Sequence, residues 1–192
     1  MRPARALSCA RVDEKHGAAT KREVIRGNLA RIRERMDAAA DRAGRAPGDI
    51  RLIPVTKSVG VEEVRILVEA GYSELGENRL DVALPKIQAL GDAVRWHMIG
   101  HVQRRKARDV VAQFDRLDSV DRMDLVEALE SRCAAADKTL PVLIEVNVSG
   151  EASKSGFTPD AAAKAVEQVR AMSPHLRVEG LMTMAPAGED AR

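Results

Sequence analysis

The stretch that decides the fold is residues 141–148, PVLIEVNV, which is apolar almost without interruption. Such a run is typical of a strand buried on both faces, as in a parallel sheet that helices cover. Thr158 and Pro159 follow it, and this pair supplies a helix N-cap and a proline at the first helical position. A buried strand with a capped helix behind it is one βα unit.

The same alternation extends in both directions along the chain. The sequence predicts further strands at residues 51–55, 74–76, 96–99, 115–120 and 177–183, and helices at 61–70, 78–90, 103–112, 123–136 and 158–172. A first helix is expected to begin at the capping box formed by Thr20 and Glu23 and to stop at Gly44. Strands that alternate with helices at this spacing predict a parallel sheet of βαβ units.

Such a sheet can be an open doubly wound sheet or a closed barrel. No Gly-x-Gly-x-x-Gly motif follows the first predicted strand, so the usual signature of a dinucleotide fold is missing. Polar residues instead gather just after the strands, where a barrel carries its chemistry. They are Lys57, Glu77, Asn78, His97, His101, Ser119, Asp121, Asn147, Ser149 and Thr183. We therefore predict an α/β fold of the (β/α)8 TIM-barrel type.

The predicted barrel is incomplete. A barrel of this type needs eight strands and typically about 250 residues, whereas the pattern here supplies six strands in 192 residues. We expect residues 20–192 to form the barrel domain with its last two βα units missing. Residues 1–19 lack helical periodicity, and we expect them to be a disordered extension.

The composition excludes several classes of function. The formal charge of +2 and the aromatic content of 2% argue against nucleic-acid binding, which needs a basic surface or stacked rings. Two cysteines cannot build a disulfide framework or a four-ligand zinc site. No stretch reaches the roughly 20 apolar residues of a membrane span, and no secretory signal is recognisable. A cytoplasmic location without membrane contact is the expectation.

Lys57 is the sharpest candidate for chemistry. It ends the apolar run LIPVTK at 52–57, where a barrel points side chains into the mouth of its active site. An ordinary lysine amine is only about 0.1% neutral at pH 7, and desolvation raises that fraction so that the amine can attack an aldehyde. Taken alone, a lysine after a strand is more often a solvated loop residue.

Other polar motifs have an ordinary structural reading beside the functional one. Asn78 could serve as the N-cap of the next helix rather than contact a ligand. His97 stands among apolar neighbours, where a core histidine bonded to the backbone is as good an explanation as a ligand contact. The loop at 149–156, SGEASKSG, could bind an anion through its backbone N–H groups or be a plain flexible connection. A metal shared by His97 and His101 is disfavoured by the strand and by the intervening Gly100.

Five motifs in this order identify a family resemblance. VTK at 55–57, GEN at 76–78, WHMIGHVQ at 96–103, EVNVS with SKSGF at 145–157, and GLMTMAP at 180–186 resemble the pyridoxal phosphate homeostasis proteins. These are single-domain relatives of the N-terminal barrel of alanine racemase. The resemblance covers about residues 22–186.

The resemblance implies that Lys57 carries pyridoxal 5′-phosphate (PLP) as a Schiff base. It also implies that Asn78 and His97 line the cofactor pocket and that Met182 lies on the strand facing the ring. The implied function is to bind and buffer PLP in vitamin B6 homeostasis without robust catalysis. The implied partners are PLP and PLP-dependent apoenzymes, and the protein is expected to be a monomer or a weak dimer.

Two further expectations follow from the resemblance. The family's phosphate-binding segments belong to the last two βα units, so we expect a chain without them to bind PLP weakly or not at all. The alternative function is that of a PLP-dependent amino-acid racemase. Racemases take a second base, a tyrosine, from an additional domain, and the only tyrosine here is Tyr72.

Overall fold

The computed structural model describes residues 10–151 and 154–184, with side chains from Thr20 onward. It divides into two compact units. The first comprises Met1–Ile53 and Val59–Tyr72, and the second comprises Pro54–Ser58 and Ser73–Arg192. The short segment Pro54–Ser58, which carries Lys57, therefore belongs to the unit that contains the sheet.

The first unit is helical. Its elements are α1 (Ala10–Arg42), the 3₁₀ turn η1 (Pro47–Asp49) and α2 (Val61–Glu69). An ion pair of 2.6 Å joins Lys21 of α1 to Glu63 of α2, and a second pair joins Arg22 to Glu69. Such exposed pairs contribute little, about 0–1 kcal/mol each.

Helix α1 begins earlier than the sequence predicts. The capping box predicts a start at Thr20, but the helix starts at Ala10, so the backbone of residues 10–19 is helical rather than disordered. Alanine, arginine, glutamate and lysine dominate this stretch, and their high helix propensities allow the helix to continue without an amphipathic pattern. Residues 1–9 of the predicted extension lie outside the described residues.

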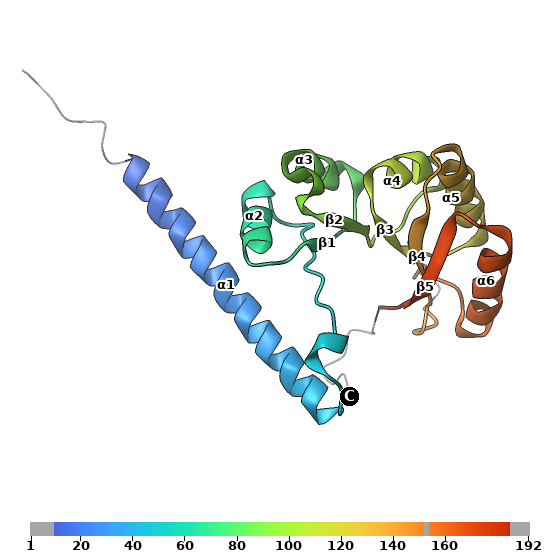
Figure 1. The fold of residues 1–192 in the computed structure, drawn as a ribbon, viewed down its shortest axis with the longest axis horizontal. Coiled ribbons are helices and arrows are strands. Elements are labelled where there is room, and N and C mark those ends of the chain that lie inside the picture. Colours follow the sequence, from blue (N-terminus) through green and yellow to red (C-terminus); the bar gives the residue numbers. More distant parts are fainter. Residues whose placement is uncertain (1–9, 152–153, 185–192) are drawn as a thin grey trace, which may run out of the picture. The chain divides into compact units, whose positions relative to one another are not determined.

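The second unit is a sheet of parallel strands with helices between them. The strands are β1 (Glu74–Glu77), β2 (Arg95–Met98), β3 (Arg116–Val120), β4 (Leu140–Glu145) and β5 (Leu176–Met182), hydrogen-bonded in this order. The helices are α3 (Leu80–Leu90), α4 (Ala107–Gln113), α5 (Met123–Ala135) and α6 (Pro159–Met172), with 3₁₀ turns η2 (Gly91–Ala93) and η3 (Arg104–Lys106). Figure 1 shows α3 to α6 on one side of the sheet. The predicted parallel βα alternation is confirmed.

The core of this unit lies between the sheet and its helices. Leu75 is in register with Trp96, and Leu117 is in register with Val142, so neighbouring strands present apolar side chains to the same face. All four are at most 1% exposed. Burying side chains of this size stabilises the fold by about 1.5–3 kcal/mol each.

The first predicted strand is not a ladder strand. Residues 51–55 make a single bridge, Val55 with Gly76, flanked by two hydrogen bonds: Gly76 N–H donates to the Pro54 carbonyl, and Thr56 N–H donates to the Gly76 carbonyl, both at 2.9 Å. Proline lacks an N–H group and cannot donate to a ladder. The described sheet therefore has five strands with a one-residue bridge at its β1 edge, and the prediction of a sixth strand at 51–55 is wrong.

The predicted N-terminus of the last helix is confirmed. The Thr158 hydroxyl accepts a hydrogen bond from Ala161 N–H, and Pro159 opens α6.

Among the described helices, none combines the length and apolar character needed to cross a membrane.

Candidate functional site

Lys57 lies at the carboxyl end of the sheet, directly after the bridge between Val55 and Gly76. It is exposed, and its amine makes no hydrogen bond or ion pair with any residue that the structure describes. The Thr56 hydroxyl contacts Glu77, which is buried against α3, and Lys57 follows at the start of a turn.

A second lysine lies behind this segment. Lys86 of α3 is 4% exposed, and its Nζ contacts the Glu77 carboxylate and the Thr56 carbonyl oxygen, each at 2.6 Å. Sequence analysis placed Glu77 among the polar residues at the strand ends but assigned no role to Lys86. A sequence signal existed: Lys86 and Glu77 lie nine residues apart, across the turn that joins a strand to its helix.

Asn78 follows β1 but does not cap α3. The N-cap position is Arg79, whose backbone is extended and whose side chain makes no capping bond, so the N-cap reading of Asn78 is wrong. Asn78 is half-buried, and its side-chain amide has no partner among the described residues. Its backbone packs against Gly100, where a Cβ atom would lie 2.2 Å from the Asn78 carbonyl oxygen. Only glycine allows the chain after β2 to pass this close to Asn78.

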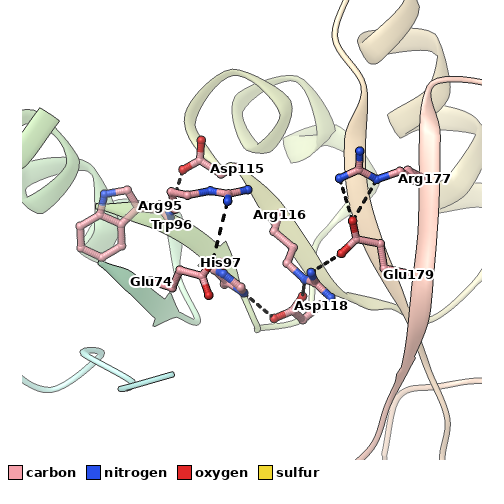
Figure 2. Close-up of polar contacts among 9 residues, drawn as sticks. All are labelled: Glu74, Arg95, Trp96, His97, Asp115, Arg116, Asp118, Arg177 and Glu179. Carbon is pink, nitrogen blue, oxygen red and sulfur yellow. Dashed lines mark hydrogen bonds and ion pairs between the residues drawn. The ribbon is translucent and has the colours of Figure 1, made fainter. Parts of the chain in front are cut away.

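His97 belongs to a network of charges that joins β2, β3 and β5, which Figure 2 shows. Its Nδ1 lies 3.0 Å from the Asp118 carboxylate, to which Arg116 Nε also donates at 2.6 Å. Arg116 pairs further with Glu179, and Arg177 pairs with the same carboxylate at 2.7 Å. The network thus crosses from β2 through β3 to β5. His97 is buried and bonded to a carboxylate, not to the backbone as the core reading expected.

The electrostatics of Asp118 favour its charged form. Burial by itself would raise the pKa of this carboxyl, but the hydrogen bonds from His97 and Arg116 outweigh burial, and the pKa lies below its ordinary value. Removing either donor would leave a buried carboxylate short of partners. The network is therefore part of what holds β2 and β3 together.

A second group of titratable residues lies at the ends of β2, β3 and β4. His101 Nδ1 contacts the Asp121 carboxylate at 2.8 Å, and Arg122 donates to the same carboxylate at 2.6 Å. Glu145, 7% exposed, has no hydrogen-bond partner for its carboxylate among the described residues. Burial and then the charge of Asp121 raise the pKa of Glu145, and nearby His101 offsets this in part.

The two histidines lie in separate polar contacts. Each imidazole is bonded to a different carboxylate, His97 to Asp118 and His101 to Asp121. Within residues 20–151 and 154–184, no group of three or more histidine, cysteine or acidic side chains has the arrangement to hold a metal ion.

The loop after β4 turns its donors inward. The Asn147 amide donates to the carbonyl oxygens of Glu151 and Lys154, and Asn147 Oδ1 accepts from Gly150 N–H and the Ser149 hydroxyl. Lys154 pairs with Glu151 at 2.7 Å. Residues 152–153 lie outside the described residues. The described donors of this loop thus favour a folded connection over an anion site.

The predicted site residues occupy different parts of the carboxyl edge. Lys57 and Asn78 lie together at the β1 edge, whereas Met182 ends β5, the last strand in the order. Met182 is in register with Glu145, so both side chains leave the sheet on one face. His97 lies within β2, below the strand end. The cofactor roles of Lys57, Asn78, His97 and Met182 stay predictions.

Parallel βα units with a free lysine amine at the carboxyl edge define an α/β protein of the (β/α)-barrel type. The family model for "Alanine racemase, N-terminal domain" matches residues 27–192. The chain belongs to this family and lies among its pyridoxal phosphate homeostasis proteins. The predicted family and the predicted fold, an incomplete TIM-barrel type, are confirmed.

Three comparisons support this assignment. A pyridoxal phosphate homeostasis protein of Pseudomonas aeruginosa is 40% identical over 172 residues, which cover 87% of this chain and 73% of the relative. The crystal structure of a protein of unknown function from Bifidobacterium adolescentis matches with a TM-score of 0.84 and 31% identity, covering 89% of this chain and 73% of that one. PipY of Synechococcus elongatus PCC7942, solved with PLP bound, matches with a TM-score of 0.67 and 28% identity, covering 80% and 71%.

Proposed function

We propose that this chain binds PLP, weakly as its sequence predicts, through a Schiff base on Lys57 and serves PLP homeostasis without robust catalysis. The observation that carries the proposal is the free, exposed amine of Lys57 at the carboxyl edge of a parallel βα sheet. Relatives named pyridoxal phosphate homeostasis protein, and a solved relative with PLP bound, support it.

The described residues fit the aldehyde end of the cofactor. A Schiff base needs an amine that is not already committed to another partner, and Lys57 meets this condition where Lys86 does not. The half-buried Asn78 amide, next to β1, offers donors and an acceptor for polar groups of a ring. PLP supplies the aldehyde and, once bound, an electron sink.

Lys57, Gly100 and His97 have separate tasks in the proposed site. Lys57 must give up its proton to become a nucleophile, and solvent at its exposed position can accept that proton. Gly100 brings the backbone after β2 onto Asn78 and so closes the site beside β1. His97, held by Asp118, keeps β2 and β3 in place below the site.

The proposal treats the protein as a carrier and not an enzyme. Racemisation needs a base on each face of the substrate α-carbon, and Lys57 could serve one face only. The relatives at 32–40% identity are named for homeostasis, whereas the family also contains alanine racemase. The racemase alternative predicts rapid loss of optical activity when the PLP-loaded chain is given L-alanine or L-serine. The carrier proposal predicts none.

PLP-dependent apoenzymes are the partners that a carrier implies, and the cytoplasm, where they act, is the location we propose. A monomer or weak dimer suffices for this role. Mixing the PLP-loaded chain with an apoenzyme tests the partnership. Delivery by the chain should restore the apoenzyme's activity faster than the same concentration of free PLP does when an unrelated protein competes for that PLP.

Trapping with borohydride tests the site of attachment. After incubation with PLP and reduction, peptide mass mapping should place the label on Lys57, and Lys57→Ala should lose it. Lys106→Ala is the matched control, because Lys106 is a lysine whose nearest carboxylate, Asp109, lies 3.7 Å away across one helical turn. A label that stays in Lys57→Ala at the wild-type amount contradicts the proposal.

A further inference from the structure

A buried ion pair lies between β1 and α3. Lys86 Nζ and Glu77 Oε1 are 2.6 Å apart, and the two side chains are 4% and 0% exposed. Taking two charges out of water is costly, and their attraction repays the cost only when the geometry is good and further hydrogen bonds are made. An apolar pair of similar volume could fill this space with equal stability. We therefore expect a specific role of the two charges in the contacts that they make.

The further hydrogen bonds all lead to Thr56. Lys86 Nζ donates to the Thr56 carbonyl oxygen at 2.6 Å, and the Thr56 hydroxyl donates to Glu77 Oε1 at 2.5 Å. Thr56 N–H donates to the Gly76 carbonyl at 2.9 Å. Every polar group of Thr56 is therefore held, two of them by the ion pair.

The chain around Thr56 has few other attachments. Val55 forms one bridge, Pro54 has no N–H to donate, and a turn begins at Lys57. Thr56 is 1% exposed, whereas Val55 is 48% exposed and Lys57 is also exposed. Thr56 is thus the last fixed point of the backbone before the Lys57 side chain.

We propose that Glu77 and Lys86 are positioning residues for Lys57: they clamp Thr56, so that the next residue, Lys57, projects its amine from a fixed backbone. What the amine binds rests on the proposed function. The charge matters because a buried ammonium can donate to the carbonyl and to the carboxylate at once, in one geometry. The clamp also commits the amine of Lys86, so that of these two lysines Lys57 is the one free for an aldehyde.

The chain offers a matched control for the clamp. Lys138 donates to the carbonyl oxygens of Val111 and Phe114, at 2.6 and 2.8 Å, before β3 begins. It makes the same kind of bond as Lys86, to backbone carbonyl oxygens, but not to Thr56. Lys138→Met should therefore weaken a lysine–carbonyl clamp without disturbing Lys57.

The test compares wild type, the double variant Glu77→Leu/Lys86→Met and Lys138→Met, all as the full chain. Replacing both charges by apolar side chains should largely keep the unfolding midpoint, because neither charge is left unpaired. The Thr56 hydroxyl keeps a longer contact to the Gly76 carbonyl, 3.4 Å away, while the Thr56 carbonyl loses its donor. The double variant thus removes the clamp while the fold stays.

The first readout needs no cofactor. Amide hydrogen exchange by mass spectrometry should show segment 54–58 exchanging about 10- to 100-fold faster in the double variant, the effect expected from losing a charge-assisted hydrogen bond. Strands β2 to β4 should keep wild-type exchange. Lys138→Met should instead speed exchange near residues 111–117. Unchanged exchange at 54–58 in the double variant would overturn the proposal.

The second readout follows Lys57 itself. With PLP and borohydride, the rate of labelling at Lys57 should fall about tenfold or more in the double variant, in line with the misplacement of a reacting group, and stay at the wild-type rate in Lys138→Met. Equal labelling rates in wild type and double variant would overturn the positioning role. If wild type takes no label at Lys57 but the exchange difference is present, the proposed function fails and the clamp stands.

Discussion

Two lysines lie at the short segment Pro54–Ser58, Lys57 within it and Lys86 bonded to it from α3, and their environments differ completely. Lys57 is exposed and has no partner among the described residues, whereas Lys86 is 4% exposed and makes two bonds of 2.6 Å. The amine is chemically the same in both. Only the surroundings make one lysine available to a ligand and the other a part of the core, and four predictions test how far this difference extends.

The largest effect is expected from the same substitution at the two lysines. Lys86→Met leaves the Glu77 carboxylate buried without its partner and should lower the free energy of unfolding by about 3–5 kcal/mol. Lys57→Met, at an exposed side chain, should change it by no more than about 0.5 kcal/mol. Urea unfolding measures both. Similar losses for the two variants would break the comparison.

A substitution at Asp118 shows whether the charge network of β2, β3 and β5 stabilises the fold as the Lys86 pair does. Asp118→Asn should cost about 1.5–3 kcal/mol at pH 7, because hydrogen bonds from His97 and Arg116 to a charged group are lost. The pKa of Asp118 is lowered in the folded protein, so its contribution is present above the unfolded pKa, about 3.9, and is lost as the pH falls through the folded value. Unfolding at pH 7 and pH 3 should show the gap between variant and wild type shrinking in acid. A gap independent of pH would contradict this.

Gly100 tests whether the Asn78 side of the site is as rigid as the Thr56 side. In Gly100→Ala the new methyl group would lie 2.2 Å from the Asn78 carbonyl oxygen, so the backbone must shift. We expect a loss of about 1–3 kcal/mol. Gly48→Ala is the control, since no atom lies within 4 Å of a Cβ there. Equal thermal stability of the two variants would mean that the chain after β2 adapts freely.

Glu145 is the opposite extreme, a buried acid without a partner among the described residues. Its pKa is raised by burial and by Asp121, so the folded protein binds the extra proton and stability falls as the pH rises from the unfolded pKa through the folded one. Glu145→Gln removes this cost and should stabilise the protein at neutral pH by about 0.5–2 kcal/mol. The gain should vanish below about pH 4. Denaturant unfolding across this pH range measures the difference between variant and wild type. A variant less stable than wild type at neutral pH would contradict the assignment.

Strand order and helix positions followed from local patterns. Most of the run at 141–148 lies in β4, which ends at Glu145, and Thr158 with Pro159 opened α6, because apolar continuity and capping chemistry act within a few residues. The segment at 51–55 failed as a strand because the same apolar pattern also suits a chain that touches the sheet at one residue.

The candidate site was predictable only in part. Lys57 and Asn78 could be located because they directly follow predicted strands. The partners of His97 and Thr56 could not, because Asp118 lies 21 residues from His97 and Lys86 lies 30 residues from Thr56. No local pattern distinguishes a lysine that will pair in the core from one that will meet solvent. The same holds for the buried acids Asp118 and Glu145, which the sequence did not single out either.

The sequence by itself determined the family, the parallel βα architecture and the one lysine placed at a strand end, since these depend on motif order, hydrophobic spacing and turn residues along the chain. The tertiary structure alone decided which charges are buried, which are paired and which amine is left free. The physical reason is that the energy of a charge depends on its distance from water and from other charges, and folding brings those together from distant parts of the chain.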